Sequence, residues 1–146
     1  MPYTIKQISQ ITGLPASTLR YYDSQGLLPS LKRDNNNIRL FSDDDIAGIK
    51  LINCLKRSGL SIRDIKNFID MLEQGDGTLN ERLAIFHKRR DILRDELKNL
   101  QDVLNVIEYK CWFYEKACEI GSTSAIDESD IPEKFRIARE NLHKVI

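Results

Sequence analysis

The sequence predicts a mainly α-helical protein: short N-terminal helices with a small β-hairpin, then one long coiled-coil helix, then a short C-terminal helix. Three observations lead to this fold class. Glycines punctuate the first 75 residues at helical intervals, a heptad repeat of apolar residues covers 79–118, and an amphipathic stretch follows a polar segment near the C-terminus. We therefore expect three parts, residues 1–75, 78–119 and 120–146.

Composition excludes several classes of protein. The 146-residue chain has 22 basic and 22 acidic residues, and 30% of it is charged, which is too polar for an integral membrane protein. No apolar run approaches the roughly 20 residues that span a bilayer, and the first residues lack the pattern of a secretory signal. Three cysteines without export indicate reduced thiols. We expect a cytoplasmic protein that does not enter membranes.

The positive charge is concentrated at the N-terminus. Up to residue 41 the only acidic residues are Asp23 and Asp34, whereas five residues are basic: Lys6, Arg20, Lys32, Arg33 and Arg39. Because a local basic patch governs contact with phosphates, a chain of zero net charge can still bind DNA.

Two short helices form the first motif. Thr4 is a good N-cap for a helix over 5–12, and Gly13 can supply its left-handed end. A second helix is expected over about 16–25, ended by Gly26. Two short helices joined by a tight turn are the signature of a helix-turn-helix, although small helix pairs also occur in proteins that never bind DNA.

A β-hairpin, or wing, follows the helix pair. Segments 27–33 and 38–41 alternate apolar and basic residues, and the Asp and Asn residues of 34–37 tolerate positive φ at a hairpin tip. The alternative is a solvated hairpin without a ligand. On DNA, such a wing would bring three basic side chains to the phosphate backbone: Lys32, Arg33 and Arg39.

Two more helices complete the head. Ser42 caps the first, whose carboxylates at 43–45 are interpreted as partners of the helix dipole and not as metal ligands. Ser61 opens the second. The glycine-rich segment 75–77 then predicts a flexible break before the rest of the chain.

The second half of the chain is one long periodic segment. Apolar or weakly polar residues recur at alternating intervals of four and three residues over more than five heptads. This is the spacing of a coiled-coil seam. So long a stripe cannot be covered by a small head, so we expect a second copy of the chain to cover it in a homodimer. The central seam residues are Leu83, Phe86, Leu93, Leu97, Leu100, Leu104 and Ile107.

A short helix is expected at the C-terminus, with Asp130 as its N-cap and Pro132 in its first turn. We expect its apolar face to dock on the coiled coil or on a head. That face consists of Ile131, Phe135, Ala138, Leu142 and Val145.

Six short motifs are spread over residues 1–75. They are Tyr3-Thr4-Ile5, Gly13-Leu14-Pro15, Thr18-Leu19-Arg20-Tyr21-Tyr22-Asp23, Gly26-Leu27-Leu28-Pro29, Arg39-Leu40-Phe41-Ser42-Asp43-Asp44-Asp45 and Gly59-Leu60-Ser61. In these motifs, their order and their spacing, the chain resembles the MerR family of bacterial transcription regulators. The resemblance implies a winged helix-turn-helix followed by an antiparallel coiled coil.

The resemblance also implies a mechanism. In that family a dimer sits on a palindromic operator between two promoter elements that are spaced too far apart for RNA polymerase. The activated dimer bends and untwists the DNA and so realigns the elements. Double-stranded promoter DNA is then the direct partner, and RNA polymerase an indirect one. Deforming such a site costs several kcal/mol, which the contacts of the dimer can offset.

By position, the resemblance places the second helix in the major groove. Arg20 would read a guanine edge or clamp a phosphate, and of Tyr21 and Tyr22 only one can face DNA. Where the family usually has Gly-Tyr in the wing, this chain has Asn37-Ile38. The side chains implied to face DNA are Ser17, Thr18, Arg20 and Tyr21 on the helix, and Arg33, Asn36 and Arg39 on the wing.

Cys54 is the sensor candidate. It lies at the edge of the expected apolar arc of its helix, formed by Ala47, Leu51, Ile52 and Leu55, with Lys50 and Arg57 as helical neighbours. Two cations beside a partly exposed thiol favour the nucleophilic thiolate. The surrounding residues also resemble the branch of the family that answers aldehydes and other electrophiles through a cysteine here. The alternative is a half-buried cysteine that only packs.

The far end of the long helix offers two further readings. Metal-sensing relatives carry cysteine ligands there, but Cys111 and Cys118 fall on the seam and suggest small packing residues, and His87 and His143 are isolated. An aromatic patch could line an effector pocket or anchor the last helix, and we favour the anchor. It consists of Tyr109, Trp112, Phe113 and Tyr114.

Two other classes of function compete with a DNA-binding regulator. A coiled-coil adaptor with a protein-binding head would show no salt-dependent affinity for DNA. An enzyme is not indicated, because the sequence has no glycine-rich phosphate loop, no metal-spaced cluster of His and Cys, and no nucleophile-base pair. The sequence suggests neither a cofactor nor a metal site.

Overall fold

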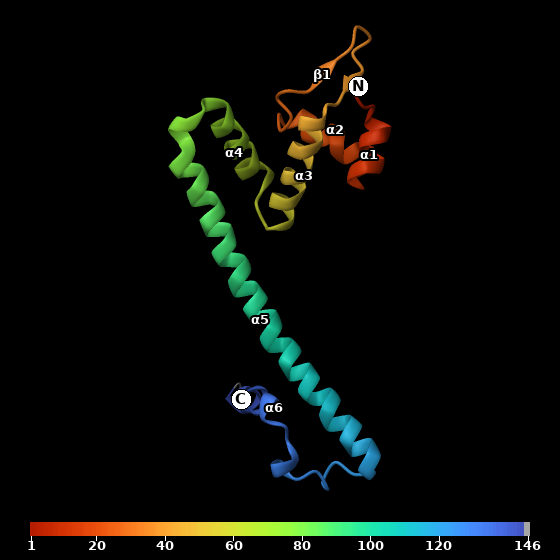
Figure 1. The fold of residues 1–146 in the computed structure, drawn as a ribbon, viewed down its shortest axis with the longest axis vertical. Coiled ribbons are helices and arrows are strands. Elements are labelled where there is room, and N and C mark those ends of the chain that lie inside the picture. The colour runs from red at the N-terminus through yellow and green to blue at the C-terminus, as the bar shows by residue number, and fades with distance from the viewer. Residues whose placement is uncertain (145–146) are drawn as a thin grey trace. The chain divides into compact units, whose positions relative to one another are not determined.

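A computed structural model of the chain describes residues 1–144 and confirms the mainly helical fold class. It divides into two compact units, Met1–Arg89 and a second that begins at Arg90. Within 1–144 no helix is both long and apolar enough to cross a membrane. The elements are α1 (Ile5–Thr12), α2 (Ala16–Ser24), β1 (Lys32–Arg33), β2 (Arg39–Leu40), α3 (Asp43–Arg57), α4 (Ile62–Gln74), the 3₁₀ turn η1 (Asp76–Thr78), α5 (Leu79–Ile120), the 3₁₀ turn η2 (Glu128–Asp130) and α6 (Glu133–Lys144) (Figure 1).

The helix starts follow from their capping residues. Thr4 and Gln7 form a capping box at α1, and Ser42 and Asp45 form another at α3. Gly13 ends α1 with a left-handed φ of 71°, so the tight turn to α2 depends on a residue without a Cβ. These local signals confirm the expected helix-turn-helix.

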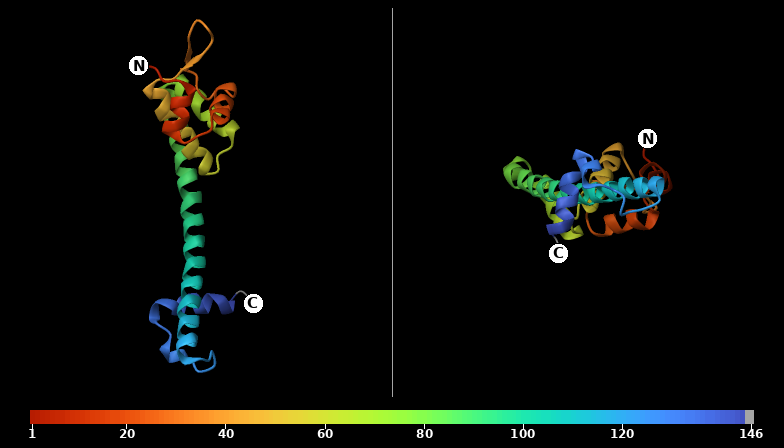
Figure 2. Two further views of the ribbon diagram at one scale, coloured as in Figure 1. Left: turned by 90° about the vertical axis from the view of Figure 1, so that its right-hand side faces the viewer. Right: turned by 90° about the horizontal axis from the view of Figure 1, so that it is seen from below.

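The wing is a two-stranded antiparallel hairpin in which Lys32 faces Leu40 and Arg33 faces Arg39. At its tip the Asp34 side chain accepts hydrogen bonds from the backbone N–H groups of Asn36 and Ile38, at 2.9 and 2.8 Å. The tip extends away from the helices of the first unit (Figure 2). The Oδ1 atom of Asp34 therefore shapes the turn at the tip of the wing.

The first unit has one hydrophobic core. It is formed by all four head helices and the base of the wing, and Phe86 of α5 packs edge-to-face on Phe68 of α4 with ring centroids 5.4 Å apart. The first turns of α5 thus belong to the head (Figure 1). The largest fully buried side chains are Tyr22, Phe41, Ile8, Leu19, Leu27, Ile49, Ile52 and Ile65.

The junction between α4 and α5 differs from the expected flexible break. Thr78 is buried, and its hydroxyl donates hydrogen bonds to the carbonyl oxygens of Met71, at 2.8 Å, and Gly75, at 2.9 Å. Residues 76–78 form the 3₁₀ turn η1. The prediction of flexibility was wrong because it counted the glycines and overlooked the threonine that ties them down. The part boundary at residue 75 stays a prediction.

In the second unit, α6 packs on α5. Tyr109 of α5 forms a small core with Ile131, Phe135 and Ala138. The expected N-cap of this segment is corrected: Asp127 caps η2 by accepting from the N–H of Ser129, and Asp130 lies inside that turn. Pro132 precedes α6, which begins at Glu133, and Val145 lies outside the described residues.

The seam of α5 is open to solvent in the single chain. Leu97 and Leu100 are each 66% exposed, and the same holds to a lesser degree for the other seam positions, which are Leu83, Phe86, Leu93, Leu104 and Ile107. A row of leucines this exposed is a surface that another apolar surface covers.

Candidate nucleic-acid interface

One face of α2 carries exposed polar and aromatic side chains. Ser17 and Arg20 are exposed, Thr18 is half-buried, and Tyr21 is 44% exposed. Tyr22, its neighbour in the chain, is 1% exposed and belongs to the core, and burial raises its pKa. The expectation that only one of the two tyrosines is free is confirmed, and the free one is Tyr21.

An acidic side chain joins the wing to α2. The Oδ2 atom of Asp23, in the last turn of α2, lies 2.7 Å from Nη2 of Arg33 and 2.7 Å from Nε of Arg39. Arg33 also donates to the carbonyl oxygen of Asn37 in the hairpin tip, at 3.1 Å. One carboxylate therefore holds both strands of the wing beside the second helix.

This pairing changes the expected role of the two arginines. Both were expected to be free for phosphate contact, whereas the Asp23 carboxylate engages each of them in the structure. Their side chains keep 36% and 24% exposure, for Arg33 and Arg39 respectively, so each still presents part of its surface. Lys32 and Asn36 are exposed on the same hairpin.

A second link ties the N-terminus to the base of the wing and to α3. The backbone of Tyr3 pairs with Phe41, and its phenol donates a hydrogen bond of 3.0 Å to the Asp43 carboxylate. That hydrogen bond raises the pKa of Tyr3 because the ionised phenolate could not donate it. Sequence reasoning missed this link, since the two residues are 40 positions apart.

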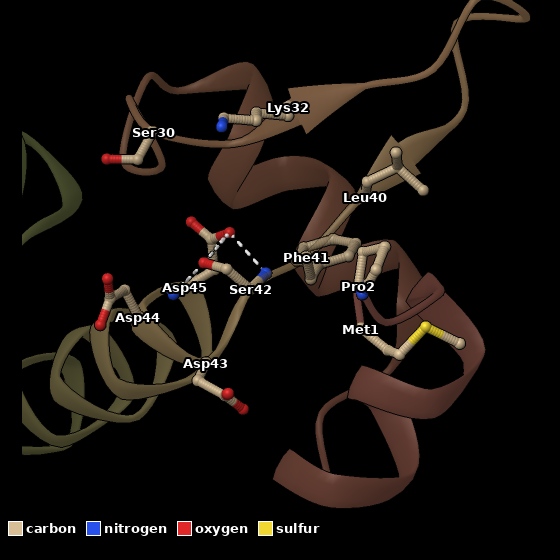
Figure 3. A pocket seen from close by; sticks show the side chains of 10 residues that line it. All are labelled: Met1, Pro2, Ser30, Lys32, Leu40, Phe41, Ser42, Asp43, Asp44 and Asp45. Carbon is tan, nitrogen blue, oxygen red and sulfur yellow. Dashed lines mark hydrogen bonds between the residues drawn. The ribbon is translucent and has the colours of Figure 1, made fainter.

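The carboxylates at the start of α3 do not converge on one point. Asp45 turns back to accept hydrogen bonds from the backbone and hydroxyl of Ser42, at 2.8 Å each, while Asp43 and Asp44 point in other directions (Figure 3). They line an open pocket of about 590 Å³ together with Lys32. Across residues 1–144, no three His, Cys, Asp or Glu residues are grouped so that they could hold a metal ion.

Cys54 is exposed near the end of α3, and so are Lys50 and Arg57. The expected apolar arc of this helix was partly wrong. Its buried side is formed by Ile49, Ile52 and Leu55, with Asp45 at the start, whereas Ala47 lies on the exposed side with Cys54. Within a single chain, the thiol is accessible and does not pack in the core.

The aromatic patch anchors the last helix. The rings of Tyr109 and Trp112 lie with their centroids 6.0 and 6.2 Å from that of Phe135 in α6. The ring of Phe113 lies 6.3 Å from that of Tyr109, and Tyr114 packs edge-to-face on Phe113 at 5.3 Å while its side chain remains 56% exposed. Cys111 and Cys118 are also exposed, as their seam positions require before a second chain covers them.

Comparison with known proteins places this geometry in a family. Residues 3–72 match the model of the MerR HTH family regulatory proteins. An uncharacterised HTH-type transcriptional regulator of Haemophilus influenzae is 39% identical over 133 residues, covering 91% of this chain and 98% of that protein. The HTH-type regulator AdhR of Bacillus subtilis is 36% identical over 96 residues, covering 66% of this chain and 64% of that protein.

Solved structures agree with these matches. HiNmlR, described as a MerR family regulator lacking the sensor domain and bound to promoter DNA, is 39% identical with a TM-score of 0.75, covering 86% of this chain and 100% of that one. A MerR family regulator from Listeria monocytogenes is 25% identical with a TM-score of 0.73, covering 97% and 98%. The chain belongs to the MerR family of helix-turn-helix transcriptional regulators.

Proposed function

We propose that the protein is a dimeric, sequence-specific DNA-binding regulator that distorts promoter DNA to control initiation. The observation that carries this proposal is the bond of Asp23 to Arg33 and Arg39. It makes α2 and the wing one preformed surface, so a major-groove helix and a backbone-contacting hairpin reach DNA together. The promoter-bound relative HiNmlR supports the same reading.

On this surface, the α2 side chains read base edges and the wing contacts the backbone. Arg20 is the main candidate for a guanine edge, because a guanidinium can donate to its O6 and N7 together. The full set comprises Ser17, Thr18, Arg20 and Tyr21 from α2, and Arg33, Asn36 and Arg39 from the wing.

Dimerisation follows from the exposed seam. A palindromic operator needs two copies of α2, and two antiparallel copies of α5 cover each other's leucines. RNA polymerase is then an indirect partner, which responds to the changed promoter DNA. The protein would act in the cytoplasm and would not be an enzyme.

The signal would be an electrophile that reacts with Cys54. With an aldehyde, the sulfur bonds to the carbonyl carbon, the C=O π pair moves to the oxygen, and that oxygen takes up the thiol proton, giving a hemithioacetal. The exposure of Cys54 between the cations Lys50 and Arg57 supports this choice. A small ligand or metal at the far end of the coiled coil, near Cys111 and Cys118, is the second candidate signal.

Run-off transcription from the promoter beside the protein's own gene tests this proposal. We expect a reactive aldehyde to stimulate transcription with the wild type but not with Cys54→Ser, while Cys111→Ser responds as the wild type does. If Cys54→Ser responds fully, the thiol is not the sensor. If the wild type binds no promoter DNA, the regulator proposal fails and a protein-binding adaptor becomes the better interpretation.

A further inference from the structure

Two arginines one heptad apart, Arg82 and Arg89, flank the seam in the first turns of α5. By sequence they occupy the positions where coiled coils place charges that pair with the other helix. In the structure each instead reaches the C-terminal end of a head helix within the same chain. Both contacts lie inside the first compact unit.

Arg82 binds the end of α4. Its Nη2 donates to the carbonyl oxygen of Gly75 at 3.1 Å, and its side chain is only 16% exposed. The same oxygen accepts from the hydroxyl and the N–H of Thr78, at 2.9 and 3.2 Å. The carbonyl that caps α4 is thus held by three donors, all from the turn and helix that follow it.

Arg89 binds the end of α3. Its Nη1 donates to the carbonyl oxygen of Ser58 at 3.3 Å, and Ser58 is the C-cap of that helix. The guanidinium lies against Gly59, where an added Cβ would come within 3.1 Å of Nη1. A cation at a helix C-terminus also meets the negative end of the helix dipole, which favours both arginine contacts.

Apolar contacts lie between the two arginines. Phe86 packs edge-to-face on Phe68 of α4, and Ile85 packs on the head core. Hydrogen bonds at both ends and a ring contact between them fasten about two turns of α5 to two head helices. One contact would leave the helix free to pivot, whereas three along its length do not.

We propose that Arg82 and Arg89 are positioning residues that fix the start of the dimerisation helix to the ends of α3 and α4. They thereby set the spacing of the two DNA-binding heads of the dimer. This inference rests on the proposed function, because spacing has meaning only for a dimer on DNA. A head held this way transmits strain to DNA, since it cannot swivel to follow a relaxed site.

Half-site spacing is the measurement that tests this role. One inserted base pair at the centre of an operator moves the half-sites by about 3.4 Å and turns them by about 35°. Binding by fluorescence anisotropy is compared on the promoter fragment of the protein's own gene and on the same fragment with that insertion. The wild type should lose about tenfold or more in affinity on the fragment with the insertion, which is about 1.4 kcal/mol.

The variant Arg82→Met/Arg89→Met keeps the apolar stems and removes the donors. We expect its loss of affinity on the inserted fragment to shrink to about threefold or less. The lysine variant Arg82→Lys/Arg89→Lys, which keeps a donor for each carbonyl, should restore part of the preference. Lys88→Met removes an exposed cation that is adjacent to Arg89 in the chain, and it should keep the wild-type ratio.

The outcomes separate the two proposals. If the double methionine variant is folded and dimeric by circular dichroism and sedimentation yet keeps the wild-type ratio, the positioning role is overturned. If that variant does not fold, the ratio of affinities for the two fragments is measured with the single variant Arg89→Met, and an unchanged ratio again overturns the positioning role. If the wild type binds neither fragment, the proposed function itself fails.

Discussion

Asp23 at the end of α2 accepts a hydrogen bond from Arg39 in the wing, with Oδ2 and Nε 2.7 Å apart. The two residues are 16 positions apart in the chain, and this bond makes the helix and the hairpin one surface. The same carboxylate oxygen also holds Arg33, at 2.7 Å.

Replacing Asp23 with alanine should reduce discrimination between DNA sequences. Non-specific binding should rise because two cations are released toward phosphate, while specific binding should fall because the wing is no longer held. We expect the ratio of scrambled-DNA Kd to promoter Kd to drop about tenfold at fixed salt. Asp44→Ala removes an exposed acidic group from α3 and should leave the ratio unchanged. An unchanged ratio in Asp23→Ala would show that the wing needs no anchor.

The adjacent tyrosines of α2 should separate binding from stability. Tyr21→Ala should change the free energy of unfolding by about 0.5 kcal/mol or less and should weaken promoter binding about tenfold. Tyr22→Ala should cost about 3–5 kcal/mol of stability because it empties a fully buried site. Urea unfolding measures the change in stability, and fluorescence anisotropy measures the change in promoter affinity. Equal effects of the two substitutions would contradict the assignment of Tyr21 to the DNA face.

A charge on the seam should dissociate the dimer. Leu97→Glu places a carboxylate at a position that the partner helix must cover, so sedimentation velocity should find monomers with a folded head. Lys98→Glu reverses a charge at the next residue, which lies outside the seam, and should leave dimers intact. Dimers of Leu97→Glu with wild-type stability would mean that the chains associate through some other surface.

Asp127 should titrate below the ordinary range of an aspartate. The Ser129 hydroxyl and N–H hydrogen-bond its carboxylate and lower its pKa. A lowered pKa in the folded state contributes stability that is present above the ordinary aspartate pKa and is lost as the pH falls through the folded value. NMR titration of Ser129→Ala should find the Asp127 pKa raised, and Ser124→Ala should leave it where it is. An equal pKa in Ser129→Ala and the wild type would remove this explanation.

The parts of the fold that the sequence predicted are those with local causes. Thr4, Gly13 and Ser42 act on residues within one helical turn, so their effect can be inferred from spacing alone. The heptad of α5 repeats over many turns, so one misplaced residue does not hide it. The same local reasoning indicated that one of Tyr21 and Tyr22 is buried, but only the packed core decides which.

The parts that sequence analysis missed depend on long-range contacts. Asp23 was counted only as a negative charge, because its partners lie on strands whose positions the sequence does not give. The glycines indicated a flexible junction, whereas the Thr78 hydroxyl holds it by hydrogen bonds to the carbonyl oxygens of Met71 and Gly75. Ala47 was placed within the expected apolar arc and Cys54 at its edge, whereas both side chains are exposed because the buried face of the packed helix lies elsewhere. Arg82 and Arg89 had a visible signal, their identical heptad position, but that signal pointed to the partner helix.

The most direct test of the account is promoter binding across a series of salt concentrations, with the number of chains per site measured at saturation. We expect two chains per promoter site and an affinity that falls steeply with salt. Arg20→Ala should bind all sequences more nearly alike, with a loss of about 1–3 kcal/mol at one operator position if Arg20 reads a guanine. A promoter affinity that depends on neither salt concentration nor DNA sequence would contradict a dimeric sequence-specific regulator. So would a saturation value of one chain per site.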